Sequence, residues 1–538
     1  TEAVLLIAVE TTMFDREPDA SCRRILEIAE KTGYQELYNR HCADVSELMD
    51  RMAFHLGEDR FSKVPTDKRL ANYQKNSQDT ALIALLFHYG RYLLLASSRE
   101  DSPLPTHMGG IWNDNIYNKM DCTQDMHIDL NVQMQYWLAG PCGLTQCDLP
   151  LAQWMRDTLV PSGEKTAEQE YGAKGWVAHV TSNPWGYTSL GWHYSWGVFS
   201  FGGAWCATLL WDHYEYILDQ NYLKEIAYPI LLESARFILD YLFYDETTGY
   251  WMTGPSYSPE NKFSVDGREY YLSLSTTCDV LMVREIFQLV LRGAAILNIA
   301  DSEEILVKIK QRLTKLPPYQ IGQYGQIQEW FYDYAEPLPN HRHISHLLGL
   351  YPFTQISPQN TPALALASEV SLKRRLRDYE LTSWAGNLMT AMYARLHQGE
   401  NALKIMDMTL QQLGKPNLTV VMPDSASLLG EGTWELDGNT GITSAICEML
   451  AQSSWNGRCY EVSLLPALPE AWREGEVKGL CLMGGYTLDM AWKAGKLEQA
   501  TLSAKAGGTV IIGYQKEKRE IDLLPGKTME IRAGNFWR

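Results

Sequence analysis

The sequence has little positive charge and no long apolar segment. Its 47 Lys and Arg residues are outnumbered by 65 Asp and Glu residues, so the formal net charge is -18. Nucleic acids and anionic membranes are bound by positively charged surfaces, and this charge argues against both as partners. No uninterrupted apolar run reaches the ~18–20 residues that cross a bilayer. We therefore expect a globular protein that binds neither nucleic acid nor membrane.

The chain also lacks the common motifs for nucleotides, covalent serine chemistry and metals. Its ten cysteines form no CxxC pair, which fits a reducing compartment better than a disulfide framework. No GxSxG, Walker, GxGxxG or HExxH motif is present,. Three histidines in Asn340–His346 could be metal ligands, but Arg342 among them would repel a cation. The sequence therefore predicts neither a metal nor another cofactor.

Aromatic residues, in contrast, are abundant, with 17 Trp and 30 Tyr in 538 residues. Flat side chains with a polar tip suit a sugar-binding cleft, where they stack on the ring and bond its hydroxyls. The same residues are ordinary core filler in a large helical protein. Composition alone leaves both interpretations open.

The spacing of apolar residues predicts a mainly α fold. We expect helices at 20–55, 81–96, 202–218, 223–243, 278–298, 302–314, 383–398, 401–413 and 443–453. Consecutive helical hairpins of this number predict one large α-helical barrel. The polar stretch 60–78 reads as a connector. After residue 463, short runs separated by glycine-containing turns predict a small C-terminal antiparallel β domain.

Long loops interrupt the helical pattern and are dense in Trp, His, Asn and acidic residues. They span 105–140, 171–201, 250–275, 317–352 and 415–441. Loops longer than ~15 residues in a compact domain are usually functional or disordered. These are too aromatic for disorder. We expect them to form the rim of an active site.

Within the first loop, the segment Asp125–Trp137 places polar residues at alternating positions. As an extended strand it would put His127, Asp129 and Asn131 on one face. As a helix it would turn Asp129 away from the other two. On these residues alone, a polar edge strand or a helix entry without any catalytic role is the favoured interpretation.

Two isolated acids stand in other loops, Glu260 in TGPSYSPEN and Asp437 in WELDGNTG. Each could simply cap a helix or form a turn. Glycoside hydrolysis, however, needs such carboxyl groups. One must be kept protonated to protonate the leaving oxygen, and one must accept a proton from the attacking water.

Seven motifs in order resemble the inverting α-L-fucosidases of glycoside hydrolase family 95: GIWND, HIDLNVQMQYW, TGPSYSPEN, YGQIQEW, HRHISHLLGLYP, LDGNTG and LLPALPEAW. The resemblance implies a β-sandwich, a helical linker, a catalytic (α/α)6 barrel and a C-terminal β domain. For this chain it implies the end of the sandwich at 1–15, the linker at 16–75, the barrel at 76–462 and the β domain at 463–538. Val4–Val9 would be the last sandwich strand.

The resemblance also implies catalytic roles. It makes Glu260 the general acid and Asp437 the group that polarises water through an Asn-x-Asn pair of amides. In this chain the pair is Asp129 and Asn131, so the first position departs from the family. Because an Asp can accept a proton and an Asn cannot, either Asp129 is the direct base, or Asp129 and Asp437 share a proton as coupled acids. We favour sharing, and an inactive protein is the third outcome.

The implied substrate is a fucosylated oligosaccharide or glycan with terminal L-fucose, most simply linked α-1,2 to galactose. One rival is an α-L-galactosidase, since L-galactose carries one more hydroxyl, on C6; the bulk of His127 favours fucose. A second rival is a non-catalytic carbohydrate-binding relative. Thr181 stands where the family pattern has an acidic sugar-binding residue. The residues we assign to substrate binding are His127, Trp112, Asn113, Thr181, Trp196, Arg342 and His343.

Overall fold

The computed structural model describes residues 3–112, 125–191, 193, 197–423 and 432–532. The chain divides into two units, residues 1–53 and 54–538. The first unit contains α1 (Pro18–Thr32) and α2 (Tyr34–Met49), where the sequence predicts helices. Gly33 joins them with φ at +78°, a conformation that glycine adopts without steric cost.

Val4–Val9 is in no strand, contrary to the expectation. Four of its apolar side chains are open to solvent, from 59% exposed at Val4 to 82% at Leu5, with Ile7 and Val9 between them. A strand is stabilised by backbone hydrogen bonds to a neighbouring strand. None of the described residues pairs with this segment, and its assignment to a β-sandwich stays a prediction.

The second unit is mainly helical up to residue 450, with a few short strands. Its main helices are α3 (Thr66–Asn76), α4 (Thr80–Ser97), α5 (Asn131–Tyr136), α6 (Leu149–Trp154), α7 (Val160–Tyr171), α9 (Gly202–Ile217), α11 (Tyr228–Tyr241), α12 (Thr277–Ile296), α13 (Glu304–Leu313), α14 (Pro362–Arg375), α15 (Ser383–Arg395), α16 (Gly399–Leu413) and α17 (Asp437–Leu450). The expected helices are confirmed. The stretch 60–78 is not a plain connector, because it contains α3. Helices α6, α7 and α14 were not predicted either.

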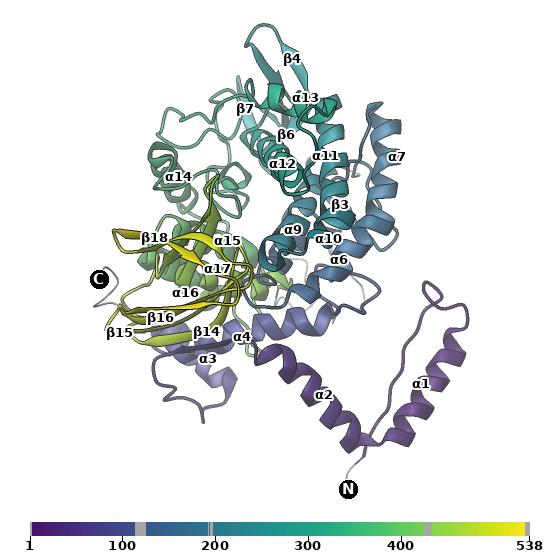
Figure 1. The fold of residues 1–538 in the computed structure, drawn as a ribbon, viewed down its shortest axis with the longest axis vertical. Coiled ribbons are helices and arrows are strands. Elements are labelled where there is room, and N and C mark those ends of the chain that lie inside the picture. Colours follow the sequence, from purple (N-terminus) through teal and green to yellow (C-terminus); the bar gives the residue numbers. More distant parts are fainter. Residues whose placement is uncertain (1–2, 113–124, 192, 194–196, 424–431, 533–538) are drawn as a thin grey trace. The chain divides into compact units, whose positions relative to one another are not determined.

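These helices form the expected α/α barrel (Figure 1). In its inner ring α12, α9, α5, α17 and α15 pack against one another in series, with α11 and α16 outside them. Every residue of α17 except Glu448 is buried, as expected for a helix surrounded by others,. At Gly441 a Cβ atom would lie 2.7 Å from Met134 Sδ. Glycine at this position therefore lets α17 and α5 approach closely.

Helix α4 has the length and composition of a membrane-spanning helix, which the sequence analysis did not expect. However, 61% of its apolar window is buried inside the protein, and it packs against α17. Its N-cap is Asp79, whose carboxylate accepts a hydrogen bond from Leu82 N,. These contacts are those of a core helix.

The C-terminal region is rich in strands, as expected. One sheet has the order β1 (Ala53–Leu56), β14 (Gly475–Leu482), β15 (Tyr486–Lys493), β16 (Lys496–Ala504), β19 (Thr528–Arg532). The other has the order β12 (Ala451–Trp455), β13 (Tyr460–Leu464), β17 (Gly508–Tyr514), β18 (Glu517–Leu523). From β12 to β19 the neighbouring strands are antiparallel, except β13 and β17, which are parallel. β12 follows α17 directly, ahead of the boundary expected at 463.

Candidate active site

The segment Asp125–Trp137 is neither one strand nor one helix. Met126 and His127 form β2, which pairs with β3 (Thr181–Ser182), and α5 begins at Asn131 after a short turn. His127, Asp129 and Asn131 are all at least 93% buried. Buried polar side chains need polar partners, and each of the three has one within the site.

His127 lies between two carboxylates. Its Nδ1 is 3.4 Å from Asp125 Oδ2, and its Nε2 is 3.1 Å from Asp129 Oδ1. Burial alone would lower the pKa of His127, but Asp129 and Asp125 outweigh it and raise this pKa well above its usual value,. His127 is therefore an imidazolium near neutral pH. Apart from this ion pair, the buried oxygens of Asp129 accept no hydrogen bond from the described residues.

Glu260 follows β6 (Ser256–Tyr257) and is held by two basic side chains. Arg342 Nη2 donates to Glu260 Oε2 at 2.5 Å, and His343 Nε2 lies 3.3 Å from the same oxygen. Burial alone would raise the pKa of Glu260, but His343 and Arg342 outweigh it and hold this pKa well below its usual range,. Glu260 is therefore ionised in the free protein, whereas a general acid must carry a proton when it acts.

Asp437 is the first residue of α17 and is fully buried. Asn131 Nδ2 donates to its Oδ2 at 2.7 Å, while Oδ1 is buried without a partner among the described residues. Burial and the nearby Glu435 raise the pKa of Asp437 well above its usual value. Burial also raises the pKa of Glu435, to about 7. The two carboxyl groups therefore do not ionise together easily, and Asp437 can accept a proton only in the form in which it has lost its own.

The other predicted substrate residues are placed as follows. Thr181 is the cross-strand partner of His127. The ring of Trp112 lies 5.5 Å from that of Trp434, which precedes Glu435 by one position. Arg342 and His343 contact Glu260 directly. Asn113 and Trp196 lie outside the described residues.

The histidines of Asn340–His346 do not converge on a metal site. His341 Nδ1 accepts a hydrogen bond from His343 N, and His346 Nδ1 lies 3.6 Å from Glu329. Across the described part of the chain, one group has metal-ligand atoms within 4.8 Å of one another, and it comprises His127, Asp129 and Glu260. The Arg342 guanidinium beside Glu260 would repel a cation from this group.

Sequence reasoning missed two acids of this site, Asp125 and Glu435. Both lie within motifs that were singled out, each two positions before a predicted site residue. Because alternate residues of an extended segment share a face, Asp125 could have been added from its spacing to His127. Glu435 offers no such signal, because its carboxylate is bound by Ser383 Oγ at 3.3 Å, from a distant part of the sequence.

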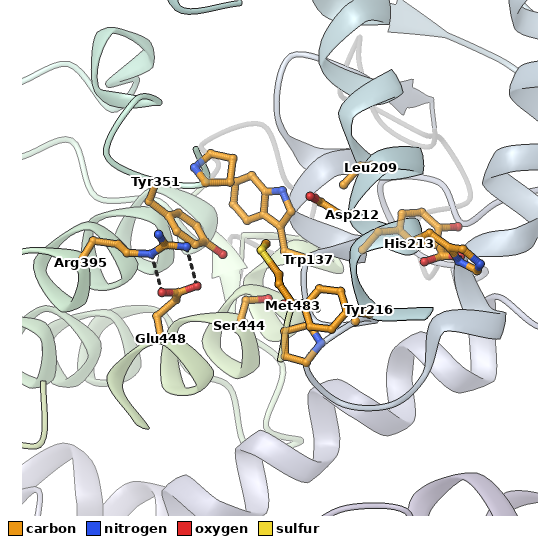
Figure 2. Close-up of a pocket in the computed structure, with 15 residues that line it drawn as sticks. Trp137, Leu209, Asp212, His213, Tyr216, Tyr351, Arg395, Ser444, Glu448 and Met483 are labelled. Carbon is orange, nitrogen blue, oxygen red and sulfur yellow. Dashed lines mark hydrogen bonds and ion pairs between the residues drawn. The ribbon is translucent and has the colours of Figure 1, made fainter. Parts of the chain in front are cut away.

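A cavity of about 50 Å³ is lined by residues that include Trp137, Tyr351 and Arg395 (Figure 2). Its walls come from the C-terminal halves of α5, α9, α15 and α17, whereas Asn131 and Asp437 begin α5 and α17. It contains the ion pairs Arg395–Glu448 and Asp148–His213. This volume holds a few water molecules. The cavity is therefore separate from the candidate active site.

A model of the glycosyl hydrolase family 95 catalytic domain matches residues 33–450, and a model of the family's C-terminal domain matches residues 455–533. The "Alpha-L-fucosidase 2" of Arabidopsis thaliana is 34% identical over 523 residues, which cover 95% of this chain and 60% of that protein. The "Probable alpha-fucosidase A" of Aspergillus niger is 30% identical over 498 residues, covering 89% of this chain and 61% of that protein.

The chain thus spans about 60% of the length of these curated relatives. Among solved structures, the "Putative kojibiose phosphorylase from human microbiome" is similar with a TM-score of 0.60 at 10% identity. That similarity covers 96% of this chain and 72% of the other, and it concerns the fold alone. The family indicated by the seven motifs is confirmed: the chain belongs to glycoside hydrolase family 95.

Proposed function

We propose that the protein is an exo-acting glycosidase that releases terminal α-linked L-fucose with inversion at the anomeric carbon. The observation that carries this proposal is the cluster of the partly buried Glu260 with the buried Asp129, Asn131 and Asp437, inside the region matched by the family's catalytic domain. The names of the curated relatives, both α-fucosidases, support fucose as the sugar.

In the proposed reaction Glu260 gives a proton to the glycosidic oxygen as the bond to the anomeric carbon breaks. A water molecule attacks that carbon from the opposite face and gives a proton to Asp437. The hydrogen bond from Asn131 Nδ2 fixes one oxygen of Asp437. The other, Oδ1, accepts nothing from the described residues, so it is free to accept from the water.

We assign Asp129 to binding a sugar hydroxyl rather than to accepting the proton from water. The nearest carboxylate oxygens of Asp129 and Glu260 are within 4.8 Å of each other. Inverting enzymes hold their two carboxyl groups roughly 6.5–9.5 Å apart so that water fits beside the sugar. This separation is too short for Asp129 to be the direct base of an inverting reaction. We therefore assign the proton from water to Asp437 alone and not to a pair of acids that share it.

Glu260 must gain a proton before it can act as the acid. Arg342 also binds Glu380, with 2.9 Å between Nη1 and Oε1. We infer that the leaving oxygen of the substrate takes the place of Arg342 at Glu260, while Glu380 retains the guanidinium. The pKa of Glu260 then rises because a cation has left it. The His127 imidazolium lies within 4.8 Å of Glu260 and supplies the proton.

The surroundings of His127 favour fucose over L-galactose. The additional C6 hydroxyl of L-galactose needs space that a small residue would leave, and His127 is held on both sides by Asp125 and Asp129. Its ring therefore cannot swing away at little cost. Thr181, on the paired strand, offers a neutral hydroxyl to the sugar where the family pattern has an acid.

The test is to incubate the protein with 2′-fucosyllactose and, separately, with the matching L-galactoside. We expect fucose release that falls by about 10²–10⁴-fold in both Glu260→Gln and Asp437→Asn. Release of L-galactose without release of fucose would identify an α-L-galactosidase. Binding of 2′-fucosyllactose without cleavage would identify a non-catalytic relative. A loss below about tenfold in either variant would exclude that residue from the chemistry.

A further inference from the structure

Glu329 lies in the loop between α13 and α14. Its carboxylate accepts hydrogen bonds from one residue that precedes Glu260 in the sequence and from one that follows it. Ser258 Oγ donates to Glu329 Oε1 at 2.8 Å, and Asn261 Nδ2 donates to Glu329 Oε2 at 3.0 Å. Ser258 and Asn261 stand two positions before and one position after Glu260. All three side chains of this network are buried, with Glu329 4% exposed.

The Glu329 carboxylate is itself fixed by the barrel. Arg375, in α14, donates from Nη2 to Glu329 Oε2 at 2.6 Å, and both side chains are buried. The backbone oxygen of Glu329 accepts from Thr277 N, at the start of α12, at 3.0 Å. Glu329 therefore links the segment that carries Glu260 to helices α12 and α14.

We propose that Glu329 is a positioning residue that aims Glu260 at the leaving oxygen of the substrate. The inference rests on the proposed role of Glu260 as the general acid. A carboxyl group that must protonate one oxygen has to stand within hydrogen-bond reach of it. A displacement of about 1 Å at a reacting group costs roughly 10²-fold in rate. The hydrogen bonds of Glu329 to Ser258 and Asn261 restrain the backbone that sets this distance.

Glu336 provides a matched control for the ion pair alone. It also binds Arg375, at 3.3 Å, and Arg374, at 3.3 Å. No hydrogen bond or ion pair recorded for Glu336 reaches Ser258–Asn261 in the described part of the chain. Glu336→Gln therefore weakens the surroundings of Arg375 as Glu329→Gln does, without releasing the segment that carries Glu260.

The experiment measures kcat and KM of Glu329→Gln, Glu336→Gln and Glu260→Gln on 2′-fucosyllactose and on α-L-fucosyl fluoride. Fluoride leaves with little help from an acid, so loss of proton donation slows the disaccharide bond far more than the fluoride. For Glu329→Gln we expect kcat on 2′-fucosyllactose to fall by roughly 10²-fold, with KM nearly unchanged and kcat on the fluoride within about fivefold. Glu336→Gln should stay close to wild type on both substrates.

Equal losses on both substrates, or no loss on either, would overturn the inference, because a purely structural role slows every substrate alike. Ser258→Ala keeps the Glu329–Arg375 pair and serves if Glu329→Gln does not fold. It should show a smaller loss with the same preference for the fluoride, and the absence of that preference overturns the inference as well. If Glu260→Gln itself shows no preference for the fluoride, the proposed acid role fails, and the inference fails with it.

Discussion

The substitution Asp129→Asn restores the residue that the family pattern has at this position, and it separates the two candidate bases. In our account Asp437 accepts the proton from water, and Asp129 binds the sugar and pairs with His127. Asp129→Asn should therefore leave a working enzyme. Asp437→Asn should not.

The expected size of the effect follows from the contacts of Asp129. The side chain is 1% exposed, and an amide of the same shape fills its space without a cavity. The substitution removes the negative charge 3.1 Å from His127 Nε2, but Asp125 stays at 3.4 Å from Nδ1. The loss is comparable with one hydrogen bond, about 0.5–1.5 kcal/mol, which is at most roughly tenfold in rate. Loss of a general base costs about 10²–10⁴-fold, or roughly 3–5 kcal/mol.

The assay is kcat/KM for fucose release from 2′-fucosyllactose by the wild type, Asp129→Asn and Asp437→Asn, with the fold of each variant checked by circular dichroism. We expect Asp129→Asn to remain within about tenfold of the wild type. The reasoning is refuted if Asp129→Asn loses as much activity as Asp437→Asn does. A comparable loss in both would restore the hypothesis that the two acids share the proton.

Two further predictions concern pH dependence and stability. Asp437 must be ionised to accept a proton, and Glu435 raises its pKa, so Glu435→Gln should move the acidic limb of the pH profile of kcat/KM to lower pH; an unmoved limb would contradict the coupling. Asp79 forms a buried ion pair with Arg69, with 2.8 and 2.9 Å between the paired atoms, and it caps α4. Asp79→Ala should lower the free energy of unfolding by about 3–5 kcal/mol, because the Arg69 charge stays buried. In the same denaturant titration Glu58→Gln, which removes the exposed Arg60–Glu58 pair, should change it by less than about 1 kcal/mol, and equal effects of the two variants would contradict this reasoning.

Most of the helical fold could be predicted from the sequence, because each long helix buries an apolar face at helical spacing. α17 shows where that reasoning stops. A helix was expected only from residue 443, after a loop at 415–441 that contains Gly438 and Gly441. The helix α17 in fact begins at Asp437. Close packing against neighbouring helices outweighs the low helix propensity of glycine there. α3 was missed because its few buried residues lie in a polar segment.

For the candidate site, the residue types could be predicted, but their protonation states could not. His127, Asp129, Asn131 and Asp437 do lie in one buried cluster, although alternation along a strand is not what unites them. The ionisation of Glu260 depends on His343 and on Arg342, the latter 82 positions away in the sequence. Such a contact forms only when the chain folds, and a local sequence pattern does not predict it. The same holds for Glu329, which reaches Ser258 across 71 positions.

Inversion at the anomeric carbon is the central proposal. It is tested most directly by proton NMR of the first sugar released from 2′-fucosyllactose. Spectra recorded before mutarotation should show β-L-fucose, because water attacks the face opposite the α-linked leaving group. Initial α-L-fucose would contradict the account. It would instead indicate a retaining reaction through the Asp129–Glu260 pair, whose oxygens within 4.8 Å suit the ≈ 5–5.5 Å separation of retaining enzymes.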